Sequence, residues 1–204
     1  MRRILIATKN PHKQKKLSEI VSDFYIPEIK KDLRSIEEKG DNFLEIAENK
    51  AKEYSKIYNC LAIATDGGAV IPALKGKWDP VKTRRFAETD QERIGQLLKM
   101  MEEKENRTEE WYEALAVADK GKLIFSTQAK AMDGVIDKTF NPKFYQEGIW
   151  LCSITSFPQF GGRNFFELTD EEKAATEDSW DKLKKSFTQF MKKSRLQKRD
   201  CVLS

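Results

Sequence analysis

Apolar and polar residues alternate with two different periods along the chain, and this pattern predicts strands interleaved with amphipathic helices. The first apolar run, residues 4–7, has the length of a buried strand. The apolar positions after it, Leu17, Ile20, Val21 and Phe24, lie on one face of a helix. The same patterns predict a strand over 25–29, a helix over 42–58, a buried strand over 61–64, a helix after Thr89, strands over 111–118 and 122–133 joined by a hairpin, a strand over 149–154 and a last helix after Thr169.

Capping signals mark the starts of the later helices. Thr89 is followed three residues on by Glu92, and Thr169 by Glu172, and each pair forms a capping box. The resulting order of strands and helices predicts an α/β fold, a mixed sheet with flanking helices. Because no linker divides the chain, we expect a single domain over residues 1–191 and a basic tail over 192–204.

Composition and charge narrow the class of protein. The chain has 204 residues, of which 39% are hydrophobic and 34% charged, as is typical of a soluble globular protein. No apolar run approaches the roughly 18 residues that span a bilayer. The three cysteines are far apart, which disfavours a disulfide framework and indicates a reducing, cytoplasmic location. The tail holds five basic residues and one acid, 5 − 1 = +4, which equals the net charge of the whole chain. The rest of the chain is therefore near neutral, and a nucleic-acid-binding surface is not indicated.

The polar loop after the first strand is suited to holding an anion. Thr8 and Asn10 offer hydrogen-bond donors, Lys13 offers a charge, and the start of the following helix offers unpaired backbone N–H groups. Pro11 fits the first helical position because its missing N–H is not needed there. The alternative is an ordinary turn between a strand and a helix.

Two acids are further candidates for a functional role. Asp66 follows the buried strand over 61–64 and precedes Gly67 and Gly68, so it either faces a ligand cleft at the end of the strand or forms a turn. Glu45 lies three residues after Asn42, where a capping acid is expected for structural reasons alone. His12 is the only histidine, which excludes a site built from several histidines.

Three basic residues are candidates for contacts with a phosphate. Lys50 lies on the same predicted helix as Glu45, and Arg85 follows a loop rich in glycine and proline. Lys173 lies in the first turn of the last helix among three acids. The alternative is a solvated side chain for Lys50 and Arg85, and an ion pair for Lys173.

Together these segments resemble the inosine/xanthosine triphosphate pyrophosphatase family over residues 3–190. The matching segments are Thr8-x-Asn10-x-x-Lys13, Glu38-Lys39-Gly40-x-x-Phe43-x-Glu45-x-Ala47-x-x-Lys50-Ala51, Ala64-Thr65-Asp66-Gly67-Gly68, Ala73-Leu74-x-Gly76, Thr83-Arg84-Arg85-Phe86-Ala87, Phe165-x-Glu167-Leu168 and Glu171-Glu172-Lys173. The resemblance implies two lobes around a central cleft, a homodimer, and hydrolysis of nucleoside triphosphates, including non-standard purine nucleotides, to the monophosphate and pyrophosphate.

The resemblance also implies a role for each matching residue. Thr8, Asn10 and Lys13 would cradle the triphosphate. Glu45 and Asp66 would hold Mg²⁺, and Asp66 would also act as the general base toward the attacking water. The basic positions near the nucleotide would be Lys50, Arg85 and Lys173.

The chain departs from the family pattern mainly where the family reads the base. Thr65 replaces the first of two adjacent acids, and Ile46 replaces an asparagine. The family's aromatic segment falls on residues 150–155, and its Ser-His-Arg motif on 177–179. We therefore expect an altered base pocket. The alternative is a catalytically degenerate, nucleotide-binding or membrane-tethered adaptor on the same scaffold.

The last four residues, Cys201-Val202-Leu203-Ser204, match the CaaX pattern for prenylation, with basic residues upstream as a second membrane signal. Cys201 is therefore a lipidation candidate, and the tail a candidate membrane attachment. The alternatives are a chance match and an added tail.

Overall fold

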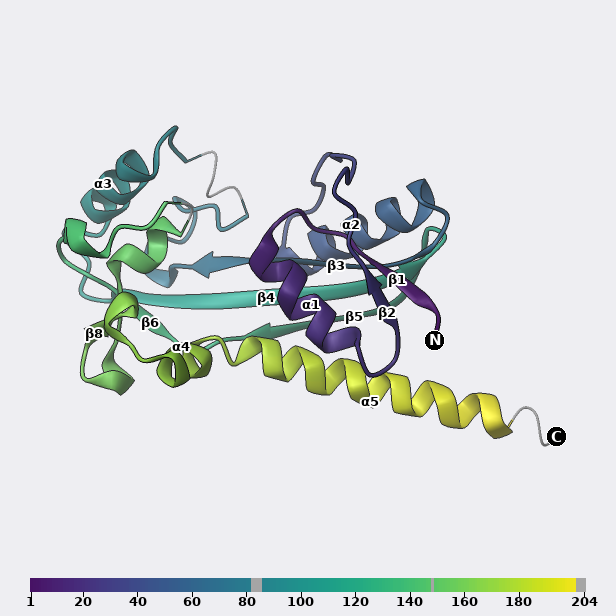
Figure 1. Cartoon of the computed structure of the whole chain (residues 1–204). Coiled ribbons are helices and arrows are strands. Elements are labelled where there is room, and N and C mark those ends of the chain that lie inside the picture. The colour runs from purple at the N-terminus through teal and green to yellow at the C-terminus, as the bar shows by residue number, and fades with distance from the viewer. Residues whose placement is uncertain (82–85, 148, 201–204) are drawn as a thin grey trace. The chain divides into compact units, whose positions relative to one another are not determined.

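The computed structural model describes residues 1–81, 86–147 and 149–200 as a mixed sheet with helices packed against it (Figure 1). The helices are α1 (Pro11–Val21), α2 (Phe43–Ile57), α3 (Asp90–Met100), α4 (Asp170–Thr176) and α5 (Ser179–Asp200). The strands are β1 (Arg3–Ile6), β2 (Ile26–Glu28), β3 (Leu61–Val70), β4 (Thr108–Asp119), β5 (Lys122–Lys130), β6 (Gly134–Ile136), β7 (Thr155–Phe157) and β8 (Arg163–Asn164). The predicted α/β class is confirmed.

The chain divides into two compact units. Unit 1 comprises residues 1–67, 113–129 and 179–204, and unit 2 comprises 68–112 and 130–178. Along the sheet the strands follow the order β2-β1-β3-β4-β6-β7-β8, and β5 pairs with β4. No helix among the described residues is both long and apolar enough to cross a bilayer.

Unit 1 is built on parallel strands. β1 pairs in parallel with β2, with Arg3 opposite Ile26, and with β3, with Ile6 opposite Ile63. Side chains from α1 and α5 pack on one face of these strands and of β4, where they form a buried apolar core. The core residues are Ile4, Ile6, Leu17, Ile20, Val21, Phe24, Leu61, Ile63, Leu115, Val117, Trp180, Leu183 and Phe187. The predicted apolar face of the first helix is thus confirmed.

Unit 2 is antiparallel. β6 pairs with β4 and with β7, and β7 pairs with β8. Its core gathers α3 and the two buried tryptophans Trp78 and Trp150, whose ring centroids lie 6.3 Å apart. Trp150 is 7% exposed and is therefore a core residue of this unit.

Two sequence predictions of strands are wrong, each for a physical reason. β3 does not stop at residues 65–68 but runs to Val70, because Gly67 and Gly68 stay out of the left-handed region and the ladder continues. Residues 150–154 form a 3₁₀ helix, not a strand. A short apolar run does not distinguish the two by periodicity.

The prediction of a single helix after Thr169 is also wrong, because this segment forms two helices, α4 and α5. The carbonyl oxygen of Thr176 accepts a hydrogen bond from the backbone N–H of Met132 at 3.3 Å, and the Thr176 hydroxyl donates to the Lys173 carbonyl at 2.8 Å. These bonds end α4 in unit 2, and α5 begins at Ser179 in unit 1. Both predicted capping boxes, at Thr89 and Thr169, are present, as is the hairpin, whose loop residues Lys120 and Gly121 both have positive φ.

A buried carboxylate in unit 2 makes folding sensitive to pH. Glu109 is 5% exposed, and the Thr155 hydroxyl donates to it at 3.1 Å. Burial raises the pKa of Glu109 from 4.5 to about 7. Between these two values the folded chain holds a proton that the unfolded chain has lost, so the free energy of unfolding falls as the pH rises.

We expect the free energy of unfolding of the wild type to fall by about 2 to 3 kcal/mol relative to Glu109→Gln between pH 5 and pH 8. Urea unfolding at several pH values measures this difference. Glu103→Gln, at an exposed position, is the control and should follow the wild-type pH dependence. Equal pH slopes for the wild type and Glu109→Gln would contradict the prediction.

Candidate functional site

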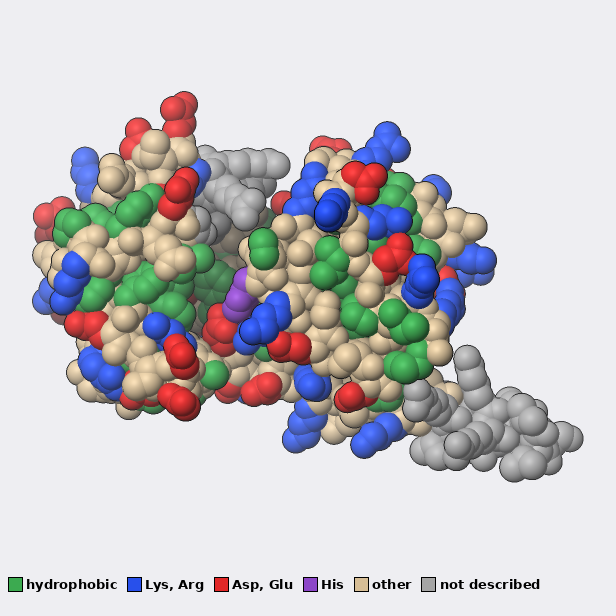
Figure 2. Space-filling view, in the orientation of Figure 1, with side chains coloured by type: hydrophobic (Ala, Val, Ile, Leu, Met, Phe, Trp, Pro, Cys, Tyr) green, Lys and Arg blue, Asp and Glu red, His purple; other side chains and the backbone are tan. Residues whose placement is uncertain are grey.

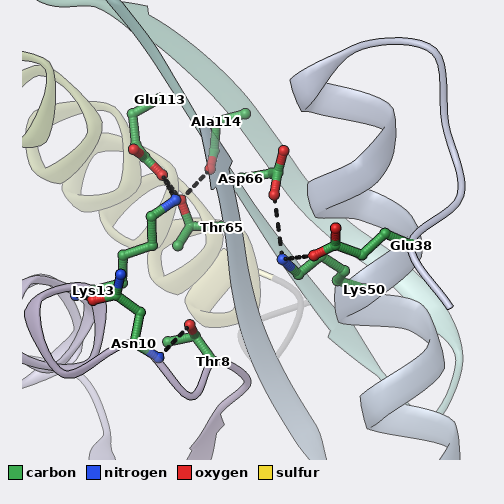
Figure 3. Close-up of polar contacts among 9 residues, drawn as sticks. All are labelled: Thr8, Asn10, Lys13, Glu38, Lys50, Thr65, Asp66, Glu113 and Ala114. Carbon is green, nitrogen blue, oxygen red and sulfur yellow. Dashed lines mark hydrogen bonds and ion pairs between the residues drawn. The ribbon is translucent and has the colours of Figure 1, made fainter. Parts of the chain in front are cut away.

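The loop between β1 and α1 is held in place by its own polar side chains (Figure 3). The backbone N–H of Asn10 donates to the Thr8 hydroxyl oxygen at 3.2 Å, and the N–H of Lys13 donates to Asn10 Oδ1 at 3.2 Å. Asn10 is therefore the N-cap of α1, with Pro11 in the first helical position as predicted. His12, drawn in purple in Figure 2, is exposed at this end of the helix.

The side-chain oxygens of Thr8 and Asn10 accept hydrogen bonds from the loop's own backbone, which leaves the donor groups of both side chains for a ligand. Thr8 and Asn10 accept backbone hydrogen bonds through their oxygens. Within the described part of the chain, neither the Thr8 hydroxyl hydrogen nor the Asn10 amide NH₂ is engaged by a protein acceptor. The loop therefore presents hydrogen-bond donors at a helix N-terminus, the arrangement that binds anions.

Lys13 reaches a buried acid on β4. Its ammonium lies 2.9 Å from Glu113 Oε1, and the two side chains are 19% and 1% exposed. The Thr65 hydroxyl contacts the same carboxylate oxygen and lies 2.6 Å from the carbonyl oxygen of Ala114. This group ties α1, β3 and β4 together within unit 1.

Asp66 forms a second group with Lys50 and Glu38. The Lys50 ammonium lies 3.2 Å from Asp66 Oδ1 and 3.0 Å from Glu38 Oε1. Successive residues of a strand point to opposite faces, so Asp66 and Thr65 lie on opposite sides of β3, as Figure 3 shows. Asp66 faces α2, and Thr65 faces α1.

Burial and charge act in opposite directions on these groups. Burial raises the pKa of Asp66 above its usual value, and the nearby Lys50 and Lys13 only partly offset it. Burial alone would lower the pKa of Lys50, but the charges of Asp66 and Glu38 outweigh it and raise that pKa. Asp66 is thus a stronger base than a carboxylate in water, and Lys50 keeps its charge.

Glu45 lies at the start of α2 and has a structural contact. The side chain of Asn42 caps the helix by accepting from the Glu45 N–H at 2.9 Å, and the Glu45 carboxylate accepts from the Asp41 N–H at 3.0 Å. Gly40 approaches this turn so closely, with φ of 138°, that a Cβ would lie 2.9 Å from the Ile46 nitrogen. Asn42 is thus the N-cap, but Glu45 accepts from the N–H of Asp41 rather than from that of Asn42, so α2 lacks a full capping box. The Glu45 carboxylate is exposed, which leaves room for a further ligand.

The remaining candidates lie in unit 2 or outside the described residues. Lys173 is in α4 of unit 2, where its ammonium lies 5.7 Å from the centre of the Phe165 ring. Arg85 and Cys201 lie outside the described residues, so their roles remain sequence predictions. Among the residues that the structure describes, no three His, Cys, Asp or Glu side chains form a cluster able to hold a metal.

Sequence reasoning did not select two acids that the fold brings to the site, Glu38 and Glu113. Glu38 appeared only as part of a motif. Glu113 had one available signal, because a charged residue in the apolar stretch 113–118 of a predicted strand is unusual. Its partners depend on which strand lies beside β4, and this is not readable from local sequence.

Comparison with known proteins agrees with the sequence resemblance. The family model described as the Ham1 family matches residues 4–179. A dITP/XTP pyrophosphatase of Oceanobacillus iheyensis is 34% identical over 131 residues, which cover 60% of this chain and 66% of the relative. One of Legionella pneumophila strain Lens is 33% identical over 122 residues, which cover 58% and 62%. The chain thus spans under two thirds of the length of these curated relatives.

A solved structure extends the likeness to nearly the whole chain. The structure of a HAM1 protein from Coxiella burnetii superposes with a TM-score of 0.77 at 26% identity, and covers 93% of this chain and 100% of that protein. The family model matches well over half of the sequence, and it includes the loop from Thr8 to Lys13 and both groups around β3. The chain therefore belongs to the Ham1 family.

Proposed function

We propose that this chain is a hydrolase that cleaves nucleoside triphosphates to the monophosphate and pyrophosphate. One observation carries the proposal. β1 and β3 are parallel neighbours with Ile6 opposite Ile63, so the loop that follows β1 lies beside Thr65 and Asp66. This register brings the anion-binding loop, which follows the carboxyl end of β1, beside the Asp66 carboxylate midway along β3.

The loop is proposed to bind the triphosphate. The Thr8 hydroxyl and the Asn10 amide donate hydrogen bonds to phosphate oxygens, and the N-terminus of α1 adds its dipole. Lys13 contributes a charge that remains partly exposed. Arg85 and Lys173 are proposed as further phosphate contacts on the strength of the family resemblance alone.

Asp66 is proposed as the base that takes a proton from the attacking water. Burial raises its pKa, which makes it a stronger base than a carboxylate in water. Its Oδ1 contacts Lys50, and the second carboxylate oxygen has no protein partner in the described part of the chain. Lys50 holds the carboxylate in one orientation.

Asp66 and Glu45 fit a hard divalent cation, because Mg²⁺ in nucleotide enzymes is held by one or two carboxylates together with substrate phosphates. When bound, the metal would neutralise phosphate charge and polarise the phosphorus–oxygen bonds. Glu45 would supply its exposed carboxylate from the first turn of α2, and Asp66 would supply its second oxygen from β3.

The substrate class is proposed to include non-standard purine triphosphates. The relatives are named dITP/XTP pyrophosphatases. The segment aligned with the family's aromatic motif is a buried 3₁₀ helix here, so the base is expected to meet different side chains. Magnesium as the metal, a homodimer, a cytoplasmic location and lipidation of Cys201 stay predictions from the sequence.

The test is a panel of triphosphates that includes dITP, XTP, ATP and dGTP, each assayed with Mg²⁺. We expect pyrophosphate and monophosphate in equal amounts from at least one of them, and loss of product on chelation of the metal. Binding of nucleotide with no release from any triphosphate would support the adaptor alternative.

A further inference from the structure

Glu113 is a buried charged group that the proposed reaction does not use. It is 1% exposed and lies in β4 next to Ala114, Leu115 and Ala116, all of which are fully buried. A carboxylate in such surroundings is unfavourable unless it is paired and hydrogen-bonded. The partners of the Glu113 carboxylate should therefore explain why a charge is buried at this position.

The Glu113 side chain points to the face of the sheet that is covered by α1 and α5, because successive residues of a strand point to opposite faces. Leu115 and Val117, two and four residues on, pack into the core under α1 and α5, as do Leu61 and Ile63 of β3. Glu113 and Thr65 continue these two rows, so both point toward α1. Figure 3 shows Glu113, Thr65 and Lys13 together on this side of β3.

The contacts of Glu113 converge on the anion-binding loop. Its Oε1 lies 2.9 Å from the Lys13 ammonium and contacts the Thr65 hydroxyl. Lys13 is the third residue of α1, and it follows the capping residue Asn10 by three positions. A lysine has a flexible four-carbon stem, and a buried carboxylate at its tip restricts it to one position.

We propose that Glu113 is a positioning residue that fixes the Lys13 ammonium at the loop where the triphosphate binds. The proposal rests on the proposed function of that loop. Among the described residues Glu113 is the only acceptor of the Lys13 ammonium, so two of its three hydrogens remain for phosphate oxygens. Without the carboxylate, Lys13 moves away into solvent, and the loop loses its fixed charge.

Thr65 holds the Glu113 carboxylate at a second point, and a substitution at position 65 can test the role of Glu113. Thr65 stands where the resembled family carries an acid, and the Glu113 carboxylate reaches the Thr65 hydroxyl from the neighbouring strand. An acid placed at position 65 would therefore bring a carboxylate to the same side of β3. The double variant Thr65→Asp/Glu113→Ser moves the charge from β4 to β3 while keeping it near Lys13.

The experiment compares Glu113→Gln with the wild type and with Glu109→Gln. Glu109 is a matched control, because it is also a buried glutamate of β4 that accepts from a threonine hydroxyl, Thr155, but it lies in unit 2. The measurements are KM and kcat for pyrophosphate release, calorimetric affinity for inorganic tripolyphosphate, and thermal unfolding. We expect Glu113→Gln to raise KM and to weaken tripolyphosphate binding about tenfold, with a much smaller change in kcat.

Glu109→Gln should leave KM and tripolyphosphate affinity at their wild-type values, and Thr65→Asp/Glu113→Ser should recover at least part of the lost affinity. A purely structural role would change unfolding without this selective loss. Unchanged KM and tripolyphosphate affinity in folded Glu113→Gln would overturn the inference. A wild type that releases no pyrophosphate would instead overturn the proposed function, and the tripolyphosphate titrations would still decide the role of Glu113.

Discussion

Asp66→Asn is expected to lower kcat for pyrophosphate release by about a thousandfold. The amide keeps the shape of the side chain but accepts no proton and binds a divalent cation poorly. Lys50 also loses one of its two charged partners, at 3.2 Å, and keeps Glu38 at 3.0 Å. Since burial already disfavours the charged form of Asp66, the substitution should have little effect on the free energy of unfolding.

Steady-state assays with the best triphosphate of the panel measure this effect, and thermal unfolding checks that the variant is folded. Asp119→Asn is the control in the same unit, because Asp119 pairs with Arg2 at the end of β4 and plays no part in the proposed reaction. The assignment of Asp66 as the base would be wrong if Asp66→Asn kept a tenth or more of the wild-type kcat.

Lys50→Met is expected to lower kcat/KM by about a hundredfold and to move the acidic limb of the pH–rate profile to higher pH. The positive charge of Lys50 lowers the pKa of Asp66 against the effect of burial. Its removal therefore raises this pKa further. A base works only when deprotonated, so activity in the variant should begin at a higher pH than in the wild type.

The profile of kcat/KM against pH measures this shift. Lys56→Met is the matched control, because Lys56 lies on α2 as well but is exposed. It should leave both the rate and the position of the acidic limb unchanged. An acidic limb that stays in place in Lys50→Met, despite a lower rate, would show that Asp66 does not govern the pH dependence.

Local signals predicted the parts of the site that form within a few residues of sequence. Pro11 lies in the first helical position of α1, and Asn42 caps α2 at the predicted start of that helix. The starts of these helices depend on capping residues within three positions. They could be predicted because their hydrogen bonds join neighbours in the chain.

Features that depend on distant partners were missed. The sequence predicts that the strand ends before Asp66, which would then face a cleft or form a turn. β3 instead runs on to Val70, so Asp66 lies within the strand. The partners of Glu113 are residues 48 and 100 positions away, and they meet only because β4 pairs beside β3 under α1. Strand order is a property of the whole sheet, which local patterns do not contain.

The proposed products, a monophosphate and pyrophosphate, imply that water attacks the α-phosphorus of the nucleoside triphosphate. Hydrolysis in ¹⁸O-labelled water, followed by mass spectrometry of both products, tests this directly. We expect one labelled oxygen in the nucleoside monophosphate and none in the pyrophosphate, in a reaction that Asp66→Asn suppresses. Label in the pyrophosphate, or release of unlabelled monophosphate, would contradict it.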